Sequence, residues 1–167
     1  DRVFEAQAWE GRLRIEEAVV TAEDVACLSG GAGGADGRSV LFLDLETTGL
    51  SGGAGTVAFL VGCGRFVDGA FETRQFLLPG FAAEKALLAA ASAHAADAGA
   101  MVTYNGKTFD VPVMETRWAF HRLASPWEDL AHFDMLHMAR RLWRSRVDGL
   151  GLTGCRLVTL ERDLFEV

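Results

Sequence analysis

The sequence has little cysteine and no long apolar run. Its 167 residues include only three cysteines, Cys27, Cys63 and Cys155, and their wide spacing excludes a CxxC metal or redox pair. Isolated thiols of this kind are typical of reduced, buried side chains, so we expect a cytoplasmic protein. No apolar stretch reaches the ~18 residues that span a bilayer, and no signal-peptide pattern is visible. We therefore expect no membrane partner.

Positive charge is also scarce. The formal net charge is -7, which argues against a protein that coats nucleic acid with a generally basic surface. The charge is uneven, because residues 107–146 carry seven basic and five acidic side chains, a net charge of +2 against -9 for the rest of the chain. This segment would either form a local basic face or present ordinary solvated helix surfaces, and the sequence leaves both readings open.

Two common nucleotide-binding loops are absent. The Gly-rich segment over residues 29–37 lacks the GxGxxG spacing and precedes a predicted strand rather than a helix, which excludes dinucleotide binding. Gly106-Lys107-Thr108 resembles the end of a phosphate-binding P-loop, but the position of that loop's first glycine holds Met101. We therefore expect no nucleotide cofactor.

The length fits one domain, which we expect to cover residues 39–167. Residues 1–38 are predicted to be an N-terminal extension, with short strands over 3–9 and 12–20 and a flexible Gly-rich linker over 29–37.

Hydrophobic patterning predicts an α/β fold for this domain. The first three predicted strands can form an antiparallel meander, because Asp68-Gly69 is a hairpin signal. Later strands return through helical crossovers and so lie parallel to the first. The result is a mixed sheet with helices on its faces. Strands are predicted over 39–46, 57–66, 70–78, 100–104 and just before residue 135, and helices over 82–98, 110–123, 135–145 and 157–165.

Within the first of these strands stands a pair of acids, Asp44 and Glu46, in the run Leu-Phe-Leu-Asp-Leu-Glu-Thr-Thr-Gly over residues 41–49. Side chains alternate along a strand, so both carboxylates point to one face, with Leu43 and Leu45 on the other. Adjacent carboxylates on a buried strand repel each other and lose hydration. A cation would relieve both costs, and carboxylate oxygens suit Mg²⁺ or Mn²⁺.

The second informative segment is Asn105-Gly106-Lys107-Thr108-Phe109-Asp110. Pro112 is acceptable only in the first turn of the following helix, which fixes the start of that helix near Asp110. Asp110 by itself is typical of a helix N-cap. Because its strand is predicted to lie parallel to the strand of Asp44, both acids would lie at the same sheet edge, where α/β folds bind their ligands. That convergence favours Asp110 as a metal ligand.

The two segments together resemble the first and second motifs of the DEDD 3′–5′ exonucleases, which have an RNase-H-like fold. The bacterial YprB-like family is the nearest in pattern, and the resemblance runs from about residue 40 to the end of the chain. It also covers shorter segments, which are residues 52–56, 74–76, 132–137, 139–143 and 155–162.

This resemblance implies a two-metal hydrolysis of phosphodiester bonds at a 3′ end, with DNA or RNA as the nucleic-acid partner. Asp44 would bridge two Mg²⁺ or Mn²⁺ ions, Glu46 would bind one of them, and Asp110 would bind the second. The residues implied in holding the terminal nucleotide are Thr47, Thr48, Gly49, Leu50, Asn105 and Phe109.

One departure from the family pattern concerns its third motif, in which a fourth Asp follows a His or Tyr. Asp148 and Asp163 lack either partner, and Asp134 is expected to be structural. Because the chain begins with Asp1 rather than Met, we expect a piece of a longer protein. Because it stops where the helix of the third motif should begin, we expect an exonuclease domain that is truncated at its C-terminus, or a degenerate one. The alternatives are a catalytically incomplete binding or interaction module and a phosphohydrolase that acts on small phosphodiesters.

Overall fold

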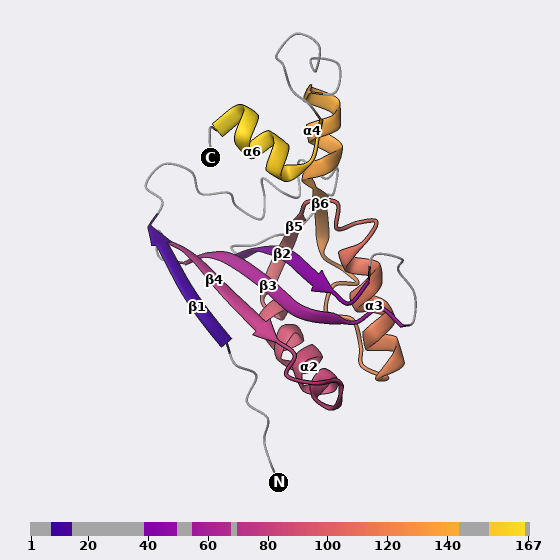
Figure 1. Cartoon of the computed structure of the whole chain (residues 1–167). Coiled ribbons are helices and arrows are strands. Elements are labelled where there is room, and N and C mark those ends of the chain that lie inside the picture. Colours follow the sequence, from indigo (N-terminus) through magenta and orange to yellow (C-terminus); the bar gives the residue numbers. More distant parts are fainter. Residues whose placement is uncertain (1–7, 15–38, 50–54, 68–69, 144–153, 166–167) are drawn as a thin grey trace.

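The computed structural model (Figure 1) describes residues 8–14, 39–49, 55–67, 70–143 and 154–165. These residues form a mixed β-sheet with α2 and α3 on one side and α4 and α6 on the other. The predicted α/β fold is therefore confirmed. No helix among these residues is both long and apolar enough to cross a membrane.

The described part of the sheet has six strands in the order β1-β4-β3-β2-β5-β6. The predicted antiparallel meander is confirmed for β2, β3 and β4. After helical crossovers, β5 lies parallel to β2 and β6 lies parallel to β5, also as predicted. The strands span Ala8–Arg14, Ser39–Thr47, Ala58–Val67, Ala70–Leu77, Ala98–Thr103 and Ala131–Asp134.

The edge strand β1 comes from the region predicted to be an extension. It pairs antiparallel with β4 along its whole length, including Gly11. The prediction of a break between strands over 3–9 and 12–20 is therefore wrong, because pairing with β4 carries one strand through the glycine despite its weak strand propensity. The linker over 29–37 lies outside the described residues, and the domain boundary at residue 39 stays a prediction.

The predicted end of the first helix is also wrong. A 3-10 turn, η1 (Phe81–Ala83), leads into α2 (Glu84–Ala95). Ala98, the last residue of the predicted helix, and Gly99 after it lie inside β5 (Ala98–Thr103). Every residue of β5 is buried, so pairing with β2 and burial on both faces outweigh the helical preference of its alanines.

The helix α3 (Asp110–Phe120) begins where Pro112 predicts, but it ends before Leu123. Arg122 adopts a φ of 56°, which is a left-handed conformation. The N–H of Leu123 donates to the carbonyl of Trp118 at 2.9 Å, and the N–H of Arg122 donates to that of Ala119 at 3.1 Å. This closure satisfies the last carbonyls of the helix and ends it.

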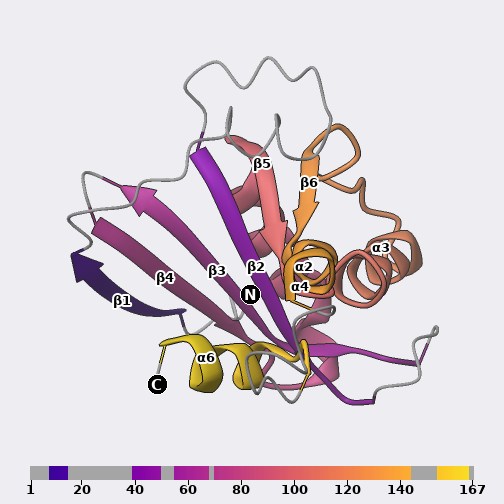
Figure 2. The same ribbon diagram turned by 90° about the horizontal axis from the view of Figure 1, so that it is seen from above.

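The predicted helices after β6 are confirmed where the chain is described. They are α4 (Met135–Trp143) and α6 (Leu157–Phe165). Figure 2 views the sheet from the side on which α4 and α6 lie.

The main core lies between the sheet and the helices α2 and α3. Leu41, Leu43 and Leu45 of β2 belong to it, together with Trp118 and Trp127, whose rings meet edge to face at 4.4 Å. The opposite face of the sheet carries a smaller apolar cluster of Val40, Ala100, Val102, Phe42, Ala131 and Phe133. Both faces of β2 are therefore apolar at the start of the strand. Toward its end, one face stays apolar and the other carries the two acids.

A buried ion-pair cluster of Glu84, Arg117 and His121 joins α2 to α3. Arg117 donates two hydrogen bonds to the Glu84 carboxylate, at 2.5 and 2.6 Å, and the His121 imidazole lies 2.7 Å from it. The side chains of Glu84 and Arg117 are only 4% and 7% exposed. Burial alone would raise the pKa of Glu84, but the hydrogen bonds from Arg117 and His121 outweigh it, so this pKa is lowered.

Replacing the acid of this cluster is expected to destabilise the protein. Glu84→Gln should lower the free energy of unfolding at pH 7 by about 3 kcal/mol, because the Arg117 guanidinium stays buried without its counter-charge. Because the pKa is lowered on folding, the stabilisation is present above the ordinary value of 4.5 and is lost as the pH falls below it. Urea unfolding across this range should show the difference between the two proteins shrink in acid.

The matched control is Glu115→Gln, which removes an exposed acid from α3 and should change stability by less than about 0.5 kcal/mol. The double variant Glu84→Gln with Arg117→Met should cost less than the sum of its parts, because it leaves no buried unpaired charge. A loss for Glu84→Gln no larger than that of the control would contradict the role of the cluster.

Candidate active site

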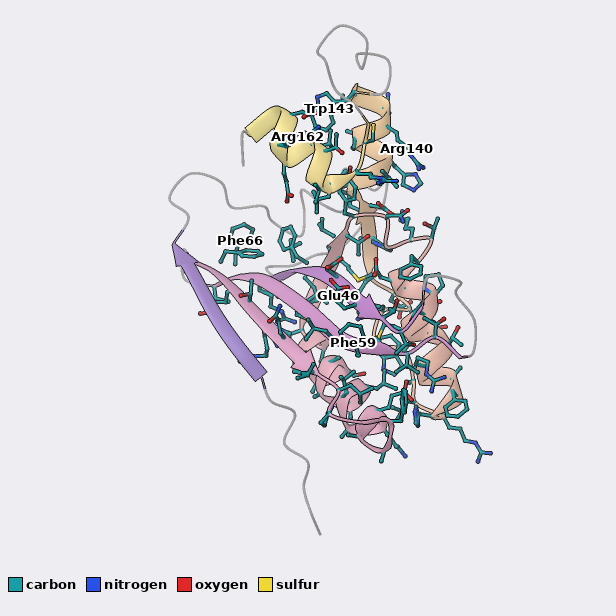
Figure 3. All side chains as sticks on the ribbon, viewed as in Figure 1. Glu46, Phe59, Phe66, Arg140, Trp143 and Arg162 are labelled. Carbon is teal, nitrogen blue, oxygen red and sulfur yellow. The ribbon has the colours of Figure 1, made fainter. Side chains whose placement is uncertain are left out.

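The strand β2 places Asp44 and Glu46 on one face of the sheet, as predicted. Burial alternates along this strand, with Leu43 and Leu45 buried and the two acids exposed. Figure 3 shows Glu46 near the carboxyl end of β2. The pairing of β2 with β5 ends at Phe42 opposite Val102, so both acids lie on a part of β2 that continues beyond its parallel neighbour.

Asp110 is the first residue of α3 and is 4% exposed. The N-cap position belongs to Phe109 and has no side-chain capping hydrogen bond. The N-cap interpretation of Asp110 is therefore wrong, because Asp110 is itself the first residue of the helix. Burial, and then the charge of Asp44, raise the pKa of Asp110, and a hydrogen bond from the backbone N–H of Leu45 lowers the pKa of both acids. The carboxyls of Asp44 and Asp110 and the backbone N–H of Leu45 therefore interact at the carboxyl end of β2.

The electrostatics of the pair are unfavourable when no cation is present. Burial, then the charge of Asp44, raise the pKa of Asp110 to about 6, and Asp134 adds to the shift. Burial, then the charge of Glu46, raise the pKa of Asp44. The carboxylates are partly removed from water and repel one another, which is the setting in which a divalent cation is stabilising.

The donor chemistry of this edge fits Mg²⁺ or Mn²⁺. Asp44 and Asp110 supply hard oxygen ligands from two elements, and Glu46 lies on the same face of β2. Among the described side chains, no group of three or more His, Cys, Asp and Glu converges closely enough to enclose a metal ion. Ions of this class usually keep several water ligands and need only one or two carboxylates from the protein.

The loop between β5 and α3 has a special backbone that the Asn-Gly pair permits. Asn105 adopts a φ of 69°. A Cβ atom on Gly106 would lie 2.5 Å from the Cβ atom of Thr103, so only glycine fits at this position. The pair does not form a hairpin turn, and the chain enters α3 instead.

Asp134, at the end of β6, holds this loop. Its carboxylate accepts hydrogen bonds from the backbone N–H groups of Asn105 at 2.8 Å, Lys107 at 3.0 Å and Leu136 at 3.0 Å. The bond from Leu136 is an N-cap interaction that an Asp before a helix predicts. The two bonds to the loop, which connect β6 to the approach to Asp110, have no signal in the sequence because they join residues 27 to 29 positions apart.

The residues expected to hold a nucleotide lie on two segments beside this edge. The backbone of Thr48 donates to the carbonyl of Val57, and its hydroxyl accepts from the Val57 N–H. The hydroxyl of Thr47 donates to the carbonyl of Gly49 at 2.9 Å. These bonds fix the turn that follows the two acids of β2. Leu50 lies outside the described residues.

On the second segment, Asn105 is exposed and its side chain accepts a hydrogen bond from the hydroxyl of Thr108 at 2.8 Å. Phe109 is half-buried, which agrees with either core packing or a contact with a base. Asp163 of α6 forms an ion pair with its neighbour Arg162 at 2.7 Å, and Asp148 lies outside the described residues.

An apolar groove begins at Asp44 and follows the face of the sheet opposite α2. It has a volume of about 610 Å³. Phe42 and Phe71 line it and pack edge to face with Phe66, which Figure 3 labels. Gly64 belongs to its floor, where a Cβ atom would lie 2.4 Å from the ring of Phe71. Tyr104 and Leu157 close its other side, and the Tyr104 hydroxyl donates to the carbonyl of Cys155 at 2.5 Å.

Comparison with known proteins agrees with this arrangement. Residues 41–167 match the model of the RNase_H superfamily. Over 122 residues the chain is 41% identical to the uncharacterized protein YprB of Bacillus subtilis (strain 168), an alignment that covers 72% of this chain and 29% of that protein. The chain thus spans less than a third of the length of this relative. With its mixed sheet, its flanking helices and these two matches, the chain belongs to the RNase_H superfamily and has an RNase-H-like fold.

Proposed function

We propose that this chain carries the catalytic centre of a metal-dependent 3′–5′ exonuclease of the DEDD type, which hydrolyses phosphodiester bonds of DNA or RNA. One observation carries the proposal. Asp44 and Asp110 come from motifs 66 positions apart, and their carboxyls lie together at the carboxyl end of β2, near enough for the charge of one to raise the pKa of the other. Membership of the RNase_H superfamily supports a nuclease-type chemistry.

The proposed mechanism assigns each acid a role. Asp44 would bind both of two Mg²⁺ or Mn²⁺ ions, Glu46 one of them, and Asp110 the second. Bound ions of this kind stabilise the attacking water and the leaving 3′ oxygen during in-line displacement at phosphorus. In the absence of metal, the negative charges of Asp44 and Asp110 repel each other. Bound ions would neutralise these charges and remove the repulsion.

Substrate would lie along the same edge of the sheet. The backbone of Thr47, Thr48 and Gly49 would hold the terminal nucleotide, with Leu50 or Phe109 packed against its base. Asn105 would contact the nucleotide from the β5–α3 loop. Contacts of this type do not depend on base identity, which suits a single strand or a frayed 3′ end.

A second candidate is a nucleic-acid-binding or interaction module with an incomplete site. The observation that favours it is the apolar groove, which lies open beside Asp44 and has ample volume to bind a partner without chemistry. The two candidates differ in whether metal binding is accompanied by cleavage.

The direct test is a cleavage assay with a 5′-labelled single-stranded oligonucleotide and Mn²⁺. The exonuclease should shorten it in a ladder from the 3′ end, and it should leave a circular single strand of the same sequence intact. Cutting of the circle would indicate an endonuclease. Calorimetric Mn²⁺ binding without any cleavage would favour the binding module over the exonuclease.

Removing Asp44, the acid that is proposed to bind both ions, should abolish metal binding without unfolding the protein. Asp44→Ala is expected to weaken Mn²⁺ affinity by more than about 100-fold, because loss of even an outer-shell partner costs 10–100-fold. The variant should be at least as stable as the wild type without metal, since it removes the repulsion with Glu46 and Asp110. The measurements are calorimetric titration and thermal denaturation in EDTA.

Glu115→Gln is the matched control, because it also removes one exposed carboxylate and lies on α3. It should keep wild-type Mn²⁺ affinity. Equal affinities of Asp44→Ala and the wild type would exclude Asp44 as a ligand.

The metal affinity should depend on pH through Asp110. Its pKa of about 6 means that the carboxyl must lose a proton to bind an ion, so Mn²⁺ affinity should rise with pH up to and through this value. For the metal-free protein, a folded pKa above the ordinary 3.8 means that stability falls as the pH rises from 3.8 to about 6.

The part of both pH effects that arises near pH 6 should disappear in Asp110→Asn. Calorimetry and thermal denaturation, each repeated across this pH range with and without EDTA, measure them. A wild-type affinity that is flat with pH would show that Asp110 does not bind the ion.

A further inference from the structure

Asp134 makes contacts that a simple helix cap does not need. Its side chain is 1% exposed, and its two carboxylate oxygens serve three N–H donors. Oδ1 accepts from Asn105 and Leu136, and Oδ2 accepts from Lys107. A Ser or Asn would suffice to cap α4. A carboxylate is needed only because the loop between β5 and α3 presents two further donors to the same point.

This loop determines where Asp110 lies. Its backbone N–H groups at Asn105 and Lys107 donate to the buried carboxylate of Asp134, and the acceptor of each bond therefore sets the direction of the loop backbone. From there the chain turns directly into α3, where the N–H of Val111 donates to the carbonyl of Gly106 at 2.9 Å. The first turn of α3 is therefore tied to the loop, and the loop is tied to Asp134.

A second contact between β5 and β6 supports the same arrangement. The Thr103 hydroxyl lies 2.8 Å from Nε2 of His132, and Thr103 is paired with Asp134 in the parallel register of the two strands. Gly106 packs against the side chain of Thr103. The floor under the loop is thus built by the ends of β5 and β6.

We propose that Asp134 is a positioning residue of the active site, whose carboxylate fixes the path of the Asn105–Lys107 backbone and thereby holds Asp110 beside Asp44. The inference rests on the proposed function, since it assigns the loop a role in metal binding. Asp134 itself would not bind the ion, because its buried oxygens accept hydrogen bonds from three backbone N–H groups.

The geometry allows one substitution to release the loop and keep the helix cap. In Asp134→Asn, the amide oxygen can replace Oδ1 and keep the bonds from Asn105 and Leu136. The amide NH₂ then faces the N–H of Lys107, where two donors meet and no hydrogen bond forms. The loop should lose its anchor at Lys107, whereas α4 should keep its first turn.

The experiment compares the wild type with Asp134→Asn by amide hydrogen exchange and Mn²⁺ calorimetry. In the variant, the amides of Lys107 and Val111 should exchange at least about 10-fold faster, and that of Leu136 should stay protected. Mn²⁺ affinity should fall about 10- to 100-fold, and excess Mn²⁺ should restore cleavage.

Two control variants separate positioning from loss of charge and from loss of stability. Asp129→Asn removes an exposed acid before β6 and should keep wild-type affinity. Arg65→Met removes a buried guanidinium that contacts Asp97 and the carbonyl of His94 at the end of α2. It should lower the melting temperature while the folded fraction keeps its Mn²⁺ affinity.

The proposal is overturned if Asp134→Asn keeps Mn²⁺ affinity within twofold of the wild type, or if it loses affinity only in proportion to its unfolded fraction. If the wild type itself binds no Mn²⁺, the metal-dependent function fails, and the exchange of Val111 decides the positioning role alone. A Val111 amide that stays protected in the variant would then refute it.

Discussion

The repulsion between Asp44 and Asp110 is the constraint on which the rest of this site depends. Two carboxyls that are partly removed from water would separate if the backbone allowed it. Burial, and then the charge of Asp44, raise the pKa of Asp110 to about 6. The fold must therefore hold the two acids independently. The sheet holds Asp44, and buried polar contacts at the two ends of α3 hold Asp110.

On one side, Asp44 is fixed by the centre of the sheet. β2 has β3 and β5 as neighbours, and three leucines of β2 are buried in the main core on the face opposite the acid. A slip of one residue would turn Leu43 and Leu45 outward and Asp44 and Glu46 into that core. The register of β2 therefore determines at once which residues enter the apolar core and where the acids lie.

On the other side, Asp110 is fixed by the ends of α3. Its start is tied through the β5–α3 loop to Asp134, and its last turns are tied to α2 by Glu84 and Arg117. Both anchors are carboxylates with nearly complete burial and full sets of hydrogen-bond donors. The structure thus uses two hydrogen-bonded acids to hold a third, Asp110, whose pKa is not lowered by any cation among the described residues. A helix anchored at both ends has little freedom to move its first residue away.

The sequence alone determined the meander, the parallel crossovers and the two acidic motifs, because period-two burial and the position of Pro112 are local signals. It also determined that Asp44 and Glu46 share a face. It did not determine the extent of β5, where pairing with β2 overrides alanine-rich helical preference, or the continuous pairing of β1 with β4 through Gly11. Only the tertiary structure decided that Asp110 is not an N-cap and that Asp134 reaches back to Asn105 and Lys107. These contacts join distant positions through backbone N–H groups, which every residue type carries, so the sequence holds no mark of them.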